Sequence, residues 1–279
     1  MAVSLVVAFA GSALLAPASA IHSMTAGYDP CKCHEWPWAC VNLMKGCKHL
    51  GPDLVDFYSK YAGRGCTQGT DETSSYQFCM VDSTCTKLYG GAQFTMGASS
   101  KRCSKSNDEM LKYKSVTEIA TLSQDYNVDR ATLIRLSYQA SKKANWSTVK
   151  AFWTSQTIDS WDYLQKRKDA KGLGKWVALT ALEEHFLYLK KVKSTTVFEA
   201  SIKPYHFRDP LVDSFVNKGY PAPFGFVKGT VAYEVLPNIT YIQEQFYKGR
   251  PVYDNASMLS IVNCHSFCQL SPSLFPIKK

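Results

Sequence analysis

Apolar residues in the middle of the chain, from about residue 116 to residue 193, recur with the spacing of an amphipathic helix. Three segments place most of their apolar side chains on one side of a helix of 3.6 residues per turn, namely 129–143, 147–168 and 175–193. We expect three helices there that pack on one another or on the N-terminal part of the chain. Their apolar sides need no membrane to explain them.

The pattern changes after Lys193, where β-branched and aromatic residues become frequent and partly alternate with polar residues. Segments 195–198 and 226–235 have this composition, which predicts strands. Segment 239–247 is a candidate for a third strand. We therefore expect a small β-containing region at the C-terminal end.

Short elements are also expected before residue 104. Pro52 in a first helical turn and Gly63 just beyond a last turn predict a helix over residues 52–62. Short strands are predicted near 76–81 and 93–96. The rest of this part is rich in turn-forming residues and is expected to be loops.

Together these patterns predict an α+β fold with a disulfide-rich, loop-rich N-terminal module, a helical segment and a small β-containing C-terminal part. We expect a signal peptide over 1–20 and the disulfide-rich module over 21–103. A basic helical segment follows over 104–194, and a β-containing region that packs with it covers 195–279. The polar stretch 104–108 is the predicted linker.

Ten cysteines fall into two groups, eight in the N-terminal module and two near the C-terminus. They are Cys31, Cys33, Cys40, Cys47, Cys66, Cys79, Cys85, Cys103, Cys264 and Cys268. An even number in each group favours disulfides over free thiols in an oxidising compartment. We expect the first eight to pair among themselves and Cys264 to pair with Cys268 or a close neighbour.

The N-terminus also indicates the secretory pathway. Residues 1–20 have no charged side chain and end in Ala18-Ser19-Ala20, which is typical of a signal peptide cleaved before Ile21. Retention of this segment as an anchor is the alternative. After cleavage no membrane span is expected. Three sequons predict N-glycosylation at Asn145, Asn238 and Asn255.

The formal net charge is +9, and residues 135–194 alone carry twelve basic and five acidic side chains, a net of +7. Such a field favours an acidic polysaccharide, an anionic surface or an acidic protein as partner, with nucleic acid less expected. The alternative is an ordinary solvated helix surface. The candidate binding residues in this segment are Lys142, Lys143, Lys150, Lys166, Arg167, Lys168 and Lys171.

Histidines are the candidates for chemistry, because no nucleophile, nucleotide or zinc-protease motif occurs in the chain. His185 lies on the apolar side of the third predicted helix, which predicts a buried, hydrogen-bonded side chain with a lowered pKa. His206 lies in a polar loop, and His34 lies beside a Trp-Pro-Trp cluster. No cofactor or metal is expected, since the cysteines lack paired C-x2-4-C spacing.

These patterns favour a secreted or lumenal disulfide-bonded glycoprotein that acts as a binding or structural protein toward an acidic or glycan partner. The alternative is a secreted hydrolase for an anionic or glycan substrate, with a histidine as general acid or base. The hydrolase would need two such groups within hydrogen-bond reach of one cleft.

Overall fold

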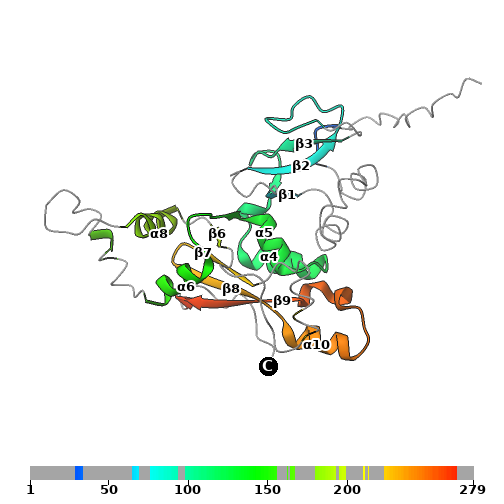
Figure 1. The fold of residues 1–279 in the computed structure, drawn as a ribbon. Coiled ribbons are helices and arrows are strands. Elements are labelled where there is room, and N and C mark those ends of the chain that lie inside the picture. Colours follow the sequence, from blue (N-terminus) through cyan, green and yellow to red (C-terminus); the bar gives the residue numbers. More distant parts are fainter. Residues whose placement is uncertain are drawn as a thin grey trace, which may run out of the picture.

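The computed structural model of the chain describes residues 29–33, 65–68, 76–93, 98–155, 162, 164–166, 180–192, 195–198, 210, 213 and 223–268. These residues have an α+β fold with two mixed sheets, as the sequence predicted (Figure 1). The first sheet belongs to the disulfide-rich module and the second to the C-terminal half. Within the described residues, no helix has the length and apolar character that crossing a membrane requires.

The first sheet has the strand order β3-β2-β1-β4. Its strands are β1 (Gly65–Gln68), β2 (Gln77–Asp82), β3 (Ala98–Arg102) and β4 (Glu109–Met110). β2 pairs antiparallel with β1 and β3, and β4 pairs parallel with β1. The predicted strand near 76–81 is therefore β2, and the sheet continues past residue 103 to Met110. Of the predicted strand 93–96, only Gln93 is described, in an isolated bridge to Ser99.

In this module, cysteine sulfurs take the place of most of the aliphatic side chains that a protein core usually contains. The buried cluster consists of Cys33, Cys66, Cys79, Val81, Cys85, Cys103 and Met110. Three disulfides cross it, Cys31–Cys85, Cys33–Cys79 and Cys66–Cys103. Such crosslinks stabilise a module with few apolar residues chiefly by restricting its unfolded chain. Cys40, Cys47 and the predicted helix 52–62 lie outside the described residues.

The second sheet has the strand order β5-β6-β7-β8-β9. Its strands are β5 (Gln139–Ala140), β6 (Thr195–Phe198), β7 (Phe224–Lys228), β8 (Val231–Pro237) and β9 (Ser260–Ser266). β5 and β6 run parallel, and the other neighbours are antiparallel. β6 confirms the predicted strand 195–198.

Two strand predictions were wrong in the C-terminal part. Segment 226–235 is not one strand but the hairpin β7–β8, because Gly229 has a φ of +61° and turns the chain. Segment 239–247 is a helix, α10 (Ile239–Tyr247), because the Asn238 side chain accepts a hydrogen bond from the Tyr241 N–H and caps it. β9 was not predicted.

Helices α4 (Val116–Asp125) and α5 (Arg130–Ser137) lie between the two sheets in Figure 1, and the short 3-10 helix η1 (Leu111–Tyr113) precedes α4. α5 begins where the sequence predicted, after Asp129, whose carboxylate accepts from the Thr132 N–H. It ends at Ser137 rather than at residue 143, because the chain then enters β5.

α6 (Trp146–Ser155) covers the first part of the predicted helix 147–168, and residues 162 and 164–166 are helical as well. α8 (Ala181–Val192) begins six residues later than the predicted 175, since Thr180 is already outside it. The Thr180 hydroxyl accepts from the Glu183 N–H, and the Glu183 carboxylate accepts from the Thr180 N–H. This reciprocal capping box fixes the first turn. A second 3-10 helix, η2 (Val252–Met258), follows α10.

The second sheet has an apolar core on each of its faces. Alternate residues of its strands point to opposite sides, so Val197, Phe226 and Tyr233 join the core with α4, α5 and α10. Their neighbours Val227 and Ala232 join the core with α6 and α8. A buried Gln77 connects β2 of the first sheet to the end of α5, because its Nε2 donates to the Ser137 carbonyl at 2.9 Å.

Candidate ligand-binding cleft in the disulfide-rich module

A polar cleft of about 430 Å³ lies in the disulfide-rich module. Three parts of the chain line it, residues 29–32, residues 84–89 after β2, and residues 101–108 from the end of β3 to the turn before β4. Its lining residues are Asp29, Pro30, Cys31, Lys32, Thr84, Thr86, Lys87, Tyr89, Lys101, Asn107 and Asp108. Small-molecule sites commonly have roughly 300–1,000 Å³. The cleft is therefore large enough for a sugar unit or a similar polar ligand.

The walls of the cleft are fixed covalently and by a turn. The Cys31–Cys85 disulfide joins residues 29–33 to the loop after β2. In that loop the Asp82 carboxylate accepts from the Thr84 N–H at 2.8 Å, and the Asp82 carbonyl accepts from the Cys85 N–H at 3.0 Å. An aspartate that bonds two residues ahead is typical of a tight turn. The opening is thus held at both sides.

The floor of the cleft contains a buried ion pair. Lys101 Nζ lies 2.7 Å from Asp108 Oδ1, and the two side chains are 7% and 6% exposed. The same ammonium donates to the Cys31 carbonyl at 2.7 Å, while Asp108 Oδ2 accepts from the Ser104 N–H at 2.9 Å. These bonds tie residues 29–32 to residues 101–108. They also leave little of the Lys101 charge for a ligand.

The rim of the cleft is more open and more positive. Lys32 and Lys87 are exposed, and neither forms an ion pair with any residue that the structure describes. The Asp29 carboxylate is engaged locally, since it accepts from the Cys31 N–H at 2.9 Å. Two exposed ammonium groups therefore stand beside the opening. An anionic group entering there would find opposite charge without breaking any ion pair among the described residues.

Tyr89 stands at the same rim with 61% of its surface exposed. Its φ of +52° is in the left-handed region, which is uncommon for a residue with a side chain. The turn is held because the Leu88 carbonyl accepts from both the Gly91 N–H (2.9 Å) and the Arg102 N–H (3.0 Å). Such backbone strain often marks binding sites. The exposed ring has a face on which a sugar could stack.

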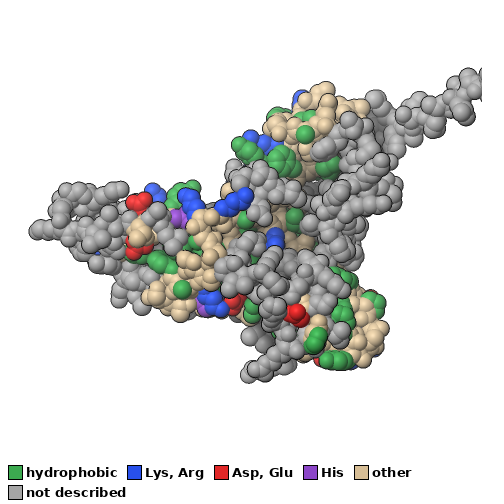
Figure 2. All heavy atoms as spheres, viewed as in Figure 1, with side chains coloured by type: hydrophobic (Ala, Val, Ile, Leu, Met, Phe, Trp, Pro, Cys, Tyr) green, Lys and Arg blue, Asp and Glu red, His purple; other side chains and the backbone are tan. Residues whose placement is uncertain are grey.

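None of the predicted binding residues that the structure describes lines this cleft. Lys142 and Lys143 are exposed after β5, Lys166 is exposed, and Arg167, Lys168 and Lys171 are outside the described residues. Lys150 is less available to bind an anionic ligand, because it forms an ion pair in which its Nζ lies 2.8 Å from Glu234 Oε1. Figure 2 shows Lys and Arg side chains both on the module and over the α8 end of the second sheet. Lys142, Lys143, Lys150 and Lys166 are thus not gathered around the cleft.

His185 is half-buried rather than fully buried as predicted, because it lies in the first turns of α8. Its Nε2 is 3.3 Å from Ser141 Oγ, and that oxygen already accepts from the Lys143 N–H at 3.2 Å. The Ser141 hydroxyl can therefore donate to a neutral imidazole. Burial and then the Lys143 charge lower the pKa of His185, in the predicted direction. His34 and His206 lie outside the described residues.

His265 belongs to a second polar network that the sequence did not reveal. Its Nε2 lies 2.9 Å from Thr154 Oγ1, and that hydroxyl donates to the Lys150 carbonyl at 2.8 Å. The imidazole must then be the donor to Thr154. Burial and the Lys150 charge lower the pKa of His265.

Glu234 completes this network. Burial alone would raise the pKa of Glu234, but hydrogen bonds from Lys150 Nζ (2.8 Å) and Trp146 Nε1 (3.1 Å) hold it below its usual value. His265 is stacked edge-on against the Trp146 ring at 6.0 Å between centroids. With its bonds directed inward, the network stabilises the contact of α6 with β8 and β9.

The predicted glycosylation sites are compatible with the fold. Asn145 accepts from the Thr148 N–H at 2.9 Å at the start of α6, and Asn238 caps α10. Asn255 is exposed and accepts from the Ser257 hydroxyl at 2.7 Å. In all three asparagines these hydrogen bonds are accepted by the amide oxygen. The amide nitrogen, which would carry a glycan, takes no part in them. Their occupancy stays a prediction.

Cys264 and Cys268 form the expected disulfide. Every described cysteine is disulfide-bonded. The chain matches no protein family model, no curated protein and no solved structure. The geometry above is therefore the basis for a functional proposal.

Proposed function

We propose that the protein is a secreted or lumenal glycoprotein that binds an acidic polysaccharide, and that the cleft of the disulfide-rich module holds part of it. The observation that carries this proposal is the pair of exposed lysines, Lys32 and Lys87, beside the exposed Tyr89. Together they offer opposite charge and an aromatic face to a sugar that bears a carboxylate or a sulfate.

The remaining lining residues fit the same ligand. Thr84, Thr86 and Asn107 are exposed and present hydroxyl and amide groups at the opening. Sugar hydroxyls both donate and accept hydrogen bonds, so they match such mixed groups. The rigid frame of disulfides and the Lys101–Asp108 pair supports binding, because little order has to be gained when the ligand enters.

The disulfides also fit a chain that folds outside the reducing cytosol. Acidic polysaccharides are polymers with repeated charges, so the positive field of the chain would attract them over a distance of about 8 Å at physiological ionic strength. In the proposal the exposed Lys142 and Lys143 contribute to this general attraction. The cleft provides the specific contact.

The proposal is tested by calorimetric titration of the mature glycosylated protein with a heparin oligosaccharide and with its desulfated, carboxyl-reduced form. The acidic form should bind and weaken with salt, and the neutral form should not bind. Tyr89→Phe should keep the affinity, while Tyr89→Leu, which removes the ring face, should lower it by several-fold. Equal binding of both oligosaccharides, or equal affinity of both variants, would refute the proposal.

Ser141 and His185 favour a second function, hydrolysis of an ester on an acidic or glycan substrate. A serine hydroxyl that donates to a neutral imidazole is the first part of a nucleophile–base pair. Ser141 is the hydrogen-bond partner of His185 among the described residues, and no described carboxylate bonds to the imidazole. Covalent labelling of Ser141 by a fluorophosphonate, abolished by His185→Gln, would support hydrolysis. No labelling would leave binding as the function.

A further inference from the structure

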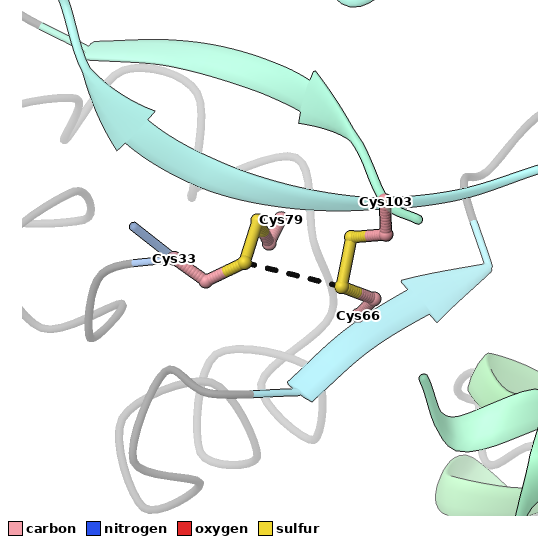
Figure 3. Close-up of side chains that lie close together, drawn as sticks. All are labelled: Cys33, Cys66, Cys79 and Cys103. Carbon is pink, nitrogen blue, oxygen red and sulfur yellow. Dashed lines mark hydrogen bonds between the residues drawn. A yellow bond between two sulfur atoms is a disulfide. The ribbon is translucent and has the colours of Figure 1, made fainter. Parts of the chain in front are cut away.

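Four sulfur atoms form one compact group in the centre of the disulfide-rich module (Figure 3). They belong to Cys33, Cys66, Cys79 and Cys103, and all lie within 4.8 Å of one another. The nearest atoms of the two disulfides are Cys33 Sγ and Cys66 Sγ, which are 3.9 Å apart. All four residues are at most 9% exposed.

We propose that these four cysteines bind one Zn²⁺ ion when the chain is reduced. The sulfurs come from separate parts of the frame, with Cys66 on β1, Cys79 on β2 and Cys103 just after β3. Hydrogen bonds pair β2 with both β1 and β3, so in the proposal these strands stay paired after reduction. Reduction would therefore leave four thiols already facing one point.

The distances fit a tetrahedral site. A Zn–S bond is about 2.3 Å, which places two ligand sulfurs of a tetrahedron about 3.8 Å apart. The closest approach between the two disulfides, 3.9 Å, is already near this value, and the other separations between them are at most 4.8 Å. The two sulfurs of each former disulfide would have to move apart, and the longer separations between the disulfides would have to shorten by at most about 1 Å. Closed sites with four thiolates are a common structural form of protein-bound zinc.

The chemistry balances with a dithiol as reductant. Each disulfide takes up two electrons and two protons from one dithiol, which is itself oxidised to a disulfide. The four protein thiols then release four protons as their thiolates bind Zn²⁺. The resulting centre has a net charge of −2. Asp108 Oδ1 lies 3.5 Å from Cys33 Sγ and brings a further negative charge close to the centre. The Lys101 ammonium is bonded to this carboxylate and offsets part of its charge.

The third disulfide of the module provides a matched control. Cys31 and Cys85 are also paired in the oxidised chain, yet their sulfurs are not part of the four-sulfur group. If the frame selects the ligands, serine at these two positions should leave zinc binding intact. If any set of reduced cysteines can bind the metal, serine at Cys31 and Cys85 should weaken zinc binding as much as serine at a position within the four-sulfur group.

The experiment uses the full chain reduced under argon with a phosphine, which becomes the phosphine oxide, and titrated with Co²⁺ and then Zn²⁺. We expect one metal per chain, the visible absorption of tetrahedral cobalt thiolate, and its replacement by zinc. Cys66→Ser and Cys79→Ser should each weaken Zn²⁺ binding by more than about 100-fold. Such a loss exceeds the roughly 10–100-fold effect of removing a residue that only hydrogen-bonds to a metal ligand.

The double variant Cys31→Ser/Cys85→Ser should stay within about threefold of the parent, in line with the small effects of residues that do not contact the metal. The oxidised chain should bind no zinc through these sulfurs. Absence of a one-to-one tetrahedral complex would overturn the proposal. Equal weakening by the control double variant and by Cys66→Ser would overturn it too.

Discussion

Lys101 Nζ donates a hydrogen bond to the carbonyl oxygen of Cys31, a residue 70 positions earlier in the chain, at a distance of 2.7 Å. Together with the ion pair to Asp108, this bond makes Lys101 the point at which two walls of the cleft meet, residues 29–32 and 101–108. A lysine with 7% side-chain exposure is unusual. Its burial is explained by the two oxygen acceptors around its ammonium.

Lys101→Met should destabilise the module strongly, because it leaves the Asp108 carboxylate buried without its cation. Removing one partner of a buried ion pair typically costs about 3–5 kcal/mol. The double variant Lys101→Met/Asp108→Leu should recover most of that loss, since no charge is then buried alone. Denaturant unfolding of the three proteins measures both effects. A Lys101→Met variant as stable as the parent would show that the pair is not buried in solution.

Removal of the disulfides should affect stability according to the length of chain that each encloses. Cys66–Cys103 spans 37 residues and Cys264–Cys268 spans 4. Loop-closure entropy then predicts losses of about 4 and about 2 kcal/mol, respectively. Paired alanine substitutions, each studied by thermal unfolding, provide the comparison. The reverse order of stability would contradict the entropic account.

Stability should fall as the pH is lowered from 7 to 5. The folded pKa values of His185 and His265 are depressed by burial, so the unfolded chain binds protons first, near its usual pKa of about 6.5. The stabilisation is complete above that pH and is lost as the pH falls below it. Glu118 and Glu234, whose pKa values are also lowered, act only below about 4.5.

The measurement is the free energy of unfolding at several pH values for the parent, His185→Gln and His265→Gln. Each substitution should flatten the decline between pH 7 and 5, because one titrating group has been removed. Only the slopes are compared, so a loss of stability that is the same at every pH does not affect the result. A decline that is unchanged in both variants would mean that neither imidazole is buried.

Gly225→Ala should destabilise the second sheet. A Cβ atom at this position of β7 would overlap the indole of Trp146, which packs over the pair that Gly225 forms with Glu234. Overpacking of this kind typically costs about 1–3 kcal/mol. The double variant Gly225→Ala/Trp146→Phe should lose less than the sum of the two single variants, because the smaller ring makes room. Strict additivity in thermal unfolding would argue against the contact.

Local signals explain which elements could be predicted from the sequence. Asp129 marks the start of α5, and the β-branched run 195–198 marks β6, because capping and alternation act within a few residues. Segment 239–247 is ambiguous in sequence because its apolar residues fit both periods. The Asn238 cap and the packing of Ile242 into the core stabilise the helix over the strand.

The cleft could not be predicted in the same way. Its walls come from residues 29–32, 84–89 and 101–108, which are brought together by disulfides. Eight cysteines allow about 100 pairings, and the sequence does not choose among them. Tyr89 before two glycines is a visible turn signal, but the burial of Lys101 depends on partners that only the folded chain provides. The density of lysines in 135–194 points to the helical segment instead.

The most direct test of the proposed function compares two pairs of lysines that carry equal charge. Lys32→Gln/Lys87→Gln removes two positive charges from the rim of the cleft, and Lys142→Gln/Lys143→Gln removes two from the surface after β5. Both proteins keep the same net charge, so any difference in the affinity for a heparin oligosaccharide reflects the site. We expect the cleft variant to bind on the order of tenfold more weakly than the parent, and the other within about threefold. Equal weakening of the two variants, or unchanged binding by the cleft variant, would contradict the account.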